Sequence, residues 1–167
     1  MKRKVLTILL ISCMAGAMLA GCGNQSGSDT GKGNSAKSSK ETTAEIAPGD
    51  NMSDAAELPL NTKVENEIYS GQTQWYAFTT GDEEGVDYGA IFVNTTPKDE
   101  EGDHTLEGMV RTEFGEEIGG GSHYVDAGES AETITIERAE PNTTYYIGVK
   151  LESFREDAGY TLVVKEK

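Results

Sequence analysis

Carboxylates, which can serve as oxygen ligands, are abundant in this chain of 167 residues, which has 29 acidic side chains and 14 basic ones. Asp50, Asn51 and Asp54 lie close together in the sequence, and Asp82 and Asp87 belong to a second acidic stretch. Ca²⁺ takes about six to eight oxygen ligands, so it is the cofactor that these residues suit. No loop has the Asp-x-Asp-x-Asp-Gly spacing of a strong calcium motif. A calcium site and a solvated acidic surface both stay open.

Catalytic chemistry finds little support in the sequence. A serine nucleophile needs a base beside it, and Ser122 and His123 are neighbours whose side chains point to opposite faces of an extended segment. His104 and His123 are the 2 histidines, too few for a structural zinc site. We therefore expect no enzyme and name no catalytic residue.

Two aromatic side chains are the candidates for ligand binding. Trp75 alternates with Tyr76, whose face we assign to the core, and Tyr146 alternates in the same way with Tyr145. A ring on the solvent face of a strand can anchor a ligand through its large, amphipathic surface. The alternative for Trp75 is that a neighbouring loop covers it.

The elements that position these residues are predicted to be β-strands. Apolar and polar residues alternate with period two in segments 63–69, 74–80, 89–95, 106–114, 118–125, 133–137, 144–152 and 160–165. Turn-rich pieces separate them, among them the run Gly119, Gly120, Gly121 and Ser122. About seven or eight short strands without a helical period predict an all-β, antiparallel β-sandwich of the jelly-roll kind.

Residues 1–21 have the pattern of an export signal. Basic residues 2–4 precede an apolar run, 5–19, that is too short for a comfortable bilayer-spanning helix. The run ends in Leu-Ala-Gly-Cys at residues 19–22, which resembles the lipobox of bacterial lipoproteins. The resemblance implies that Cys22 is lipidated, that the lipid anchors the protein to the bacterial cell membrane, and that the domain faces outside the cytoplasm.

A polar linker and an acidic domain follow. Residues 22–51 are rich in Gly, Ser, Thr, Asn and Lys, which predicts a lipidated cysteine followed by a flexible tether. Residues 52–167 form the predicted sandwich and hold 25 acidic and 8 basic side chains, a formal charge of -17. This balance excludes nucleic acid as a partner, because phosphate backbones are bound by clustered Lys and Arg. It also disfavours direct contact with an anionic membrane surface.

The predicted domain resembles a known family. Residues 54–60 (DAAELPL), 74–79 (QWYAFT), 141–149 (PNTTYYIGV) and 159–164 (GYTLVV) resemble the bacterial pre-peptidase C-terminal domain. That family is a β-sandwich appended to secreted peptidases and other exported proteins. Gln72 and Gln74 stand where the family often has Asp before the aromatic pair, and some members use such acids to bind Ca²⁺.

These patterns support a hypothesis about function. We expect a lipid-anchored envelope protein with a non-catalytic binding or accessory module that recognises a polypeptide or a polysaccharide, as the resemblance implies. An acidic, calcium-stabilised structural spacer, or a subunit of an envelope complex, is the alternative. A hydrolase is the third hypothesis.

Overall fold

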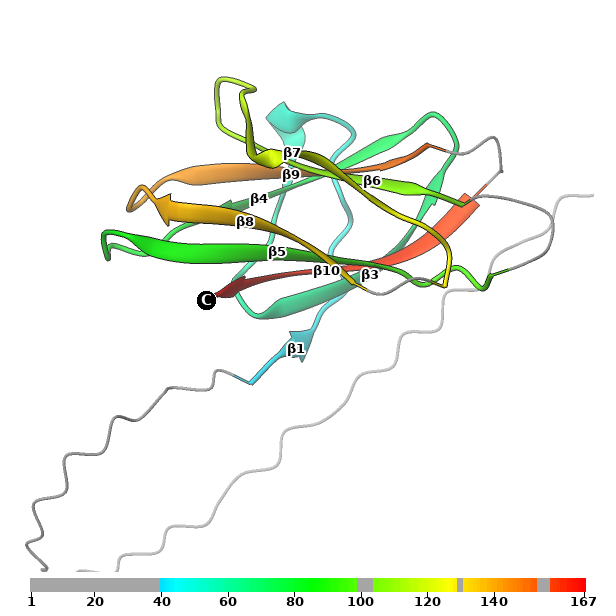
Figure 1. Cartoon of the computed structure of the whole chain (residues 1–167), viewed down its shortest axis with the longest axis horizontal. Helices are drawn as coiled ribbons and strands as arrows, with labels where there is room; N and C mark the ends of the chain where they lie inside the picture. The colour runs from blue at the N-terminus through cyan, green and yellow to red at the C-terminus, as the bar shows by residue number, and fades with distance from the viewer. Residues whose placement is uncertain (1–39, 99–103, 129–130, 153–156) are drawn as a thin grey trace, which may run out of the picture. The chain divides into compact units, whose positions relative to one another are not determined.

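The computed structural model describes residues 40–98, 104–128, 131–152 and 157–167. In this part of the chain two five-stranded sheets pack face to face (Figure 1). Sheet A has the strand order β1-β3-β10-β5-β8, and sheet B has the order β2-β4-β9-β6-β7. The strands from β3 to β10 pair antiparallel, which confirms the predicted all-β sandwich.

The strand bounds agree closely with the predicted segments. Sheet A contains β1 (Thr42–Thr43), β3 (Thr62–Tyr69), β10 (Asp157–Glu166), β5 (Val86–Asn94) and β8 (Glu132–Ala139). Sheet B contains β2 (Ala56–Glu57), β4 (Thr73–Thr79), β9 (Thr144–Leu151), β6 (Leu106–Arg111) and β7 (Glu117–Val125). A single 3-10 turn, η1 (Met52–Asp54), precedes β2 in the described chain. The segment predicted over 106–114 ends at Arg111, because Thr112 N–H donates to Glu116 O (2.9 Å) and closes a turn.

The chain moves from one sheet to the other at almost every connection. From β3 onward only β6 and β7 are consecutive strands that pair within one sheet. This alternation joins the two sheets throughout their length, as in a jelly roll. It also leaves β7 and β8 as the outer strands on one side of the sandwich.

The core lies between the sheets and consists of the residues that the alternation predicts. Tyr76, Phe78 and Tyr145 of sheet B and Tyr160 of sheet A are all buried in it. The Phe78 ring lies 5.6 Å from Tyr145 and 5.7 Å from Tyr88, between centroids. Each such ring removes about 150–250 Å² from water, so these aromatics contribute strongly to stability.

Two buried hydroxyl groups link the sheets through hydrogen bonds. The Tyr160 hydroxyl donates to Gln74 Oε1, so the Tyr76 hydroxyl donates to Tyr160 (2.8 Å). Asn66 Nδ2 donates in turn to Tyr76 (2.7 Å) and to Ile46 O (3.1 Å). Burial is the main cause that raises the pKa of both tyrosines above the ordinary value. All four side chains in this chain of bonds are therefore partnered without any charge.

The described fold begins before residue 52, which corrects the predicted boundary of the linker. Thr42 N–H donates to Asn61 O (3.0 Å), and Gly49 exchanges two backbone hydrogen bonds with Trp75 (2.9 and 3.0 Å). Ile46 packs against the core. Residues 40–51 thus run from the edge of sheet A at β3 to the edge of sheet B at β4. Their polar composition predicts a tether. The structure differs because backbone hydrogen bonds, which composition does not reveal, hold these residues to the sheets.

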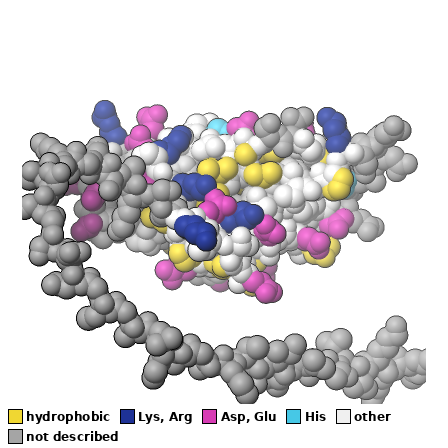
Figure 2. Space-filling view, turned by 90° about the horizontal axis from the view of Figure 1, so that it is seen from below, with side chains coloured by type: hydrophobic (Ala, Val, Ile, Leu, Met, Phe, Trp, Pro, Cys, Tyr) yellow, Lys and Arg dark blue, Asp and Glu magenta, His cyan; other side chains and the backbone are white. Residues whose placement is uncertain are grey.

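The outer face of sheet A combines lysines with apolar side chains. Lys63, Val163 and Ile91 lie side by side across β3, β10 and β5. Seen from below, Lys and Arg side chains gather near the middle of the molecule, beside acidic and hydrophobic ones (Figure 2). Lys63 pairs with Glu65 (2.8 Å), and Lys165 pairs with Glu41 (2.6 Å), which lowers the pKa of Glu41. Because these lysines have carboxylate partners, this face is not a free cationic surface.

Candidate functional site

A groove of about 840 Å³ lies on the side of the sandwich where β7 and β8 meet. One wall is the β6–β7 turn with β7 from Ile118 to His123, and the other is β8 from Thr133 to Arg138 with the corner leading into β9. The Tyr145 ring, buried in the core, lines it as well. Both walls are irregular strands, and these irregularities shape the groove.

β7 bends because four of its residues face one residue of β6. Gly108 is opposite His123 and Val110 is opposite Ile118, so residues 119–122 bulge out beside Met109. The three glycines of the bulge have φ of 72°, 95° and 94°, a region that side chains strongly disfavour. A Cβ on Gly119 would lie 2.3 Å from Ile134 Cγ2 and 2.8 Å from Thr135 O. Glycine is therefore required for β7 to lie against β8.

β8 carries a bulge of its own at the groove. Its pairing with β5 shifts by one residue between Ile136 and Ala139. Arg138, within this bulge, has a φ of 48°, which is unusual for a residue with a side chain. Its N–H donates to Asp87 Oδ1 (2.7 Å), which holds the strained backbone in place. Bulges re-aim side chains, and this one places Arg138 in the lining of the groove.

The groove combines one exposed ring with several charged groups. Phe114, in the β6–β7 turn, is 81% exposed. The carboxylates that line the groove are those of Glu113, Glu116, Glu137 and Glu140, all exposed residues. Arg138 and His123 are the basic residues of the lining. Such a surface offers an aromatic face and many hydrogen-bond acceptors to a ligand.

His123 supports the shape of the groove. Its Nε2 lies 3.1 Å from Gly119 O, to which it donates, and its Nδ1 lies 3.7 Å from Glu132 Oε2. No hydrogen bond joins it to Ser122 in the described chain. The ring therefore ties the two ends of the β7 bulge together.

Trp75 and Tyr146 share the outer face of sheet B, as the alternation predicts. Trp75 pairs with Gly148, and Tyr146 lies two residues before that glycine between Ala77 and Arg111. Trp75 is only 7% exposed, so the prediction of a solvent-facing ring is wrong. Tyr146 is half-buried.

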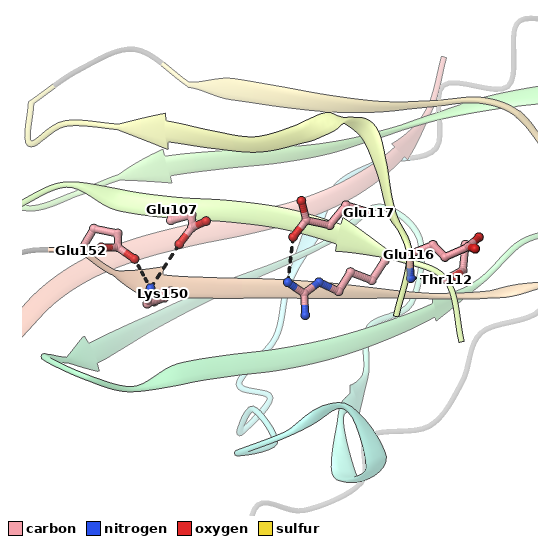
Figure 3. Close-up of polar contacts among 7 residues, drawn as sticks. Glu107, Thr112, Glu116, Glu117, Lys150 and Glu152 are labelled. Atoms are coloured by element: carbon pink, nitrogen blue, oxygen red, sulfur yellow. Dashed lines mark hydrogen bonds and ion pairs between the residues drawn. The ribbon is translucent and has the colours of Figure 1, made fainter. Parts of the chain in front are cut away.

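A side chain of β6 lies over the Trp75 ring. The Arg111 guanidinium lies 5.6 Å from the centre of the indole ring. Its Nη2 donates to Glu117 Oε1 (2.7 Å), an ion pair drawn in Figure 3. On the other strand, a Cβ at Gly148 would lie 3.0 Å from Trp75 Cη2. Gly148 thus makes the space that the indole ring fills.

The rest of this face carries an ion-pair cluster. Lys150 lies between Glu107 and Glu152 and pairs with both (Figure 3). The hydrogen bond with Glu152 is the main cause that raises the pKa of Lys150, and it likewise lowers the pKa of Glu152. Paired charges therefore cover Trp75 and the neighbouring part of this face, while Tyr124, at its β7 edge, is 59% exposed.

The residues proposed as calcium ligands have other roles in the structure. Asn51 N–H donates to Asp54 Oδ1 (2.9 Å) and Ser53 N–H donates to Asn51 Oδ1 (3.0 Å), a capping box at η1. Asp87 accepts from Arg138, as described above, while Asp50 and Asp82 are exposed. The described residues contain no group of three or more His, Cys, Asp or Glu side chains that could hold a metal.

Gln72 and Gln74 stand where the pre-peptidase C-terminal family often has Asp. In this structure both make hydrogen bonds within the fold. Gln74 accepts from Tyr160 and donates through Nε2 to Glu67 O (2.8 Å). Gln72 closes the β3–β4 turn, since its N–H donates to Tyr69 O (3.0 Å).

The export signal and Cys22 lie outside the described residues. Within those residues, no helix has the length and apolar character needed to cross a bilayer.

Comparisons with known proteins return similar solved structures but no family. No family model and no curated protein matches the chain. One similar structure is the pre-peptidase C-terminal domain of collagenase from Bacillus anthracis, with 20% identity, 66% of this chain and 93% of that chain covered, and a TM-score of 0.48. It bears the name of the family that the sequence resembles.

Two carbohydrate-binding modules are also similar. CBM36, solved with calcium and xylotriose, has 11% identity over 60% of this chain and 78% of its own, with a TM-score of 0.34. CsCBM6-3 from Clostridium stercorarium, solved with cellobiose, has 15% identity over 60% of this chain and 71% of its own, with a TM-score of 0.32. At these identities and TM-scores, the ligands of these proteins are not transferred to this chain. The class that the fold itself defines is an antiparallel β-sandwich.

Proposed function

We propose that this chain is a non-catalytic binding module of the bacterial cell envelope and that its ligand occupies the groove between β7 and β8. The observation that carries the proposal is Phe114, a large apolar ring that is 81% exposed at a groove of about 840 Å³. Clefts of this size with a few convergent polar groups are the usual form of a binding site. A ring this exposed at the edge of a groove is accessible to a ligand, for which aromatic side chains offer a large contact area.

Phe114, and not Trp75, is the aromatic ligand anchor in this proposal. Trp75 lies under Arg111 and is 7% exposed, so it stabilises the sheet from its outer face. Phe114 has no such cover, and the turn that carries it is held by Thr112, whose carbonyl accepts from Gly115 N–H (2.9 Å). A ring on a fixed turn loses little freedom on binding, which favours affinity.

The test compares two exposed aromatics in residues 23–167, which lack the expected signal and lipid acceptor. Titration calorimetry would use cellobiose, xylotriose, a ten-residue Lys-Thr repeat peptide and a ten-residue Glu-Thr repeat peptide. Phe114→Ala is expected to weaken the binding of at least one probe about tenfold, the loss typical of an aromatic anchor. Tyr124→Ala is the matched control, because Tyr124 is 59% exposed but lies opposite Glu107 on the outer face of sheet B. Equal losses in the two variants, or no binding of any probe, would overturn the proposal.

Anchoring through Cys22 is the second part of the proposal. Residues 19–22 support it, and a lipid on Cys22 would hold the module at the membrane surface. Cys22→Ser is expected to move the full-length protein from the membrane fraction to the soluble fraction of the cell. Unchanged membrane association of this variant would contradict the anchor.

A further inference from the structure

The carboxylates of the groove stand on both of its walls. Glu113 and Glu116 belong to the β6–β7 turn, while Glu137 and Glu140 belong to the end of β8 and the corner that follows. Arg138 is the one residue in this lining with a permanent positive charge. A ligand between these walls therefore meets an excess of negative charge from two sides. Charge complementarity favours a cationic ligand there.

Phe114 adds a second preference for a cation. The face of an aromatic ring attracts an ammonium or guanidinium group, most strongly when the ring is accessible to it. Phe114 is the most exposed of the large hydrophobic residues in the described chain. Glu113 precedes it directly in the turn. A Lys or Arg side chain lying on this ring would therefore enter a groove that carboxylates also line.

The backbone of β8 favours a polypeptide ligand over a small amine. Lys167 N–H donates to Asp87 O (2.9 Å) and Thr95 N–H donates to Gly159 O (2.9 Å), so the odd-numbered residues of β5 bond to β10. Its even-numbered residues then bond to β8, where Ala90 is opposite Ile134 and Tyr88 is opposite Ile136. In an antiparallel ladder the alternate residues of β8 direct their N–H and C=O groups to the other side.

These outward residues are Thr133 and Thr135, and both line the groove. β8 is the last strand of sheet A, and no backbone hydrogen bond joins it to β7 among the described residues. Gly119 approaches Thr135 O closely but does not pair with it. An extended peptide can complete such an edge with its own N–H and C=O groups.

We propose that the groove binds an extended, Lys- or Arg-containing segment of another polypeptide, between the two pairs of glutamates and along the edge of β8, which makes no backbone hydrogen bond to β7 in the described chain. This inference rests on the proposed function and names its ligand class. A neutral polysaccharide would use Phe114 but would gain nothing from the charge of the groove. The two ligand classes therefore differ in their response to charge-removing substitutions.

The experiment titrates the Lys-Thr repeat peptide and xylotriose into residues 23–167 and three double variants. Glu113→Gln with Glu116→Gln neutralises one wall, and Glu137→Gln with Glu140→Gln neutralises the other. Asp50→Asn with Glu57→Gln is the matched control, since it removes the same charge near β2, the strand at the opposite edge of sheet B from β7. Thermal melts check that every variant is folded.

Each groove variant is expected to raise the Kd of the Lys-Thr peptide about three- to tenfold, and the control about twofold or less. Equal weakening in all three variants would show attraction by overall charge and would overturn the inference. Xylotriose binding that depends on Phe114, with no binding of the peptide, would overturn the inference while upholding the proposed function. If Phe114→Ala changes the binding of neither probe, both proposals fail.

Discussion

Replacing Trp75 with alanine tests whether this residue serves stability or binding. Its indole ring fills the space above Gly148, lies under the Arg111 guanidinium and is 7% exposed. Burying an aromatic side chain removes about 150–250 Å² from water, which at about 25 cal/mol per Å² corresponds to about 4–6 kcal/mol. The unfolded chain already buries part of this area, so about 3–4 kcal/mol is expected to be lost.

The assay is thermal and urea unfolding of residues 23–167. For a domain of this size a loss of 1 kcal/mol lowers the Tm by about 4 °C, so Trp75→Ala is expected to lower it by about 12–16 °C. Phe114→Ala is the control, because a residue that is 81% exposed should change stability by less than about 0.5 kcal/mol. A Tm of Trp75→Ala within about 3 °C of this control would refute the packing role of the indole and restore it as a candidate ligand anchor.

Three further perturbations test other parts of the fold. Gly119→Ala is expected to destabilise the domain by about 2–4 kcal/mol in urea unfolding, because it adds a Cβ that overlaps β8 at a φ of 72°; an unchanged midpoint would contradict the tight β7–β8 contact. Tyr160→Phe removes the donor to Gln74 and is expected to cost about 1–3 kcal/mol in the same assay; a neutral effect would mean that water replaces the lost bond. Deleting residues 40–51 is expected to lower the Tm, since Ile46 and two backbone bonds of Gly49 are lost; an unchanged Tm would restore the boundary at residue 52.

Calcium provides a test that needs no substitution. In the described chain the capping-box oxygens already accept backbone N–H groups, and no carboxylate cluster is formed. We expect the Tm in chelator and in millimolar Ca²⁺ to agree within about 1 °C, with Mg²⁺ as the control. A calcium-selective rise of several degrees would follow from ligand linkage at a real site and would contradict this expectation.

The strands were predictable because the alternation of residue types records which face of a sheet is buried. Tyr145, Ile147 and Val149 alternate with polar residues or glycine, and all three are buried in the core. The period of two depends only on the local geometry of a strand, so no distant residue is needed to interpret it. The same local rule placed Trp75 on the outer face of its sheet.

Exposure of Trp75 was not predictable, because it depends on partners from distant strands. The pattern in β4 says which way the indole points, but Arg111 and Gly148 decide whether water reaches it. Both partners come from strands that follow much later in the sequence. Residues 40–51 were misassigned for a related reason, since their polar composition does not record backbone bonds such as that from Thr42 to Asn61.

One feature of the groove is recognisable in the sequence, the run of glycines at 119–121. This run was interpreted as a turn, whereas it forms a bulge inside β7. A bulge and a turn both need glycine at positive φ, so composition alone does not separate them. Phe114 fell within a predicted strand, and only the end of β6 at Arg111 places it on an exposed turn.

Protection of the edge strands explains part of the groove but leaves Phe114 unexplained. Bulges in outer strands prevent sheets from joining edge to edge, which accounts for Gly119 and for the strained Arg138 without any ligand. It does not account for Phe114, because an exposed aromatic ring beside a free strand edge promotes association. The exposed ring is therefore the feature on which the proposed binding groove depends, and its substitution should leave stability unchanged while weakening ligand binding about tenfold.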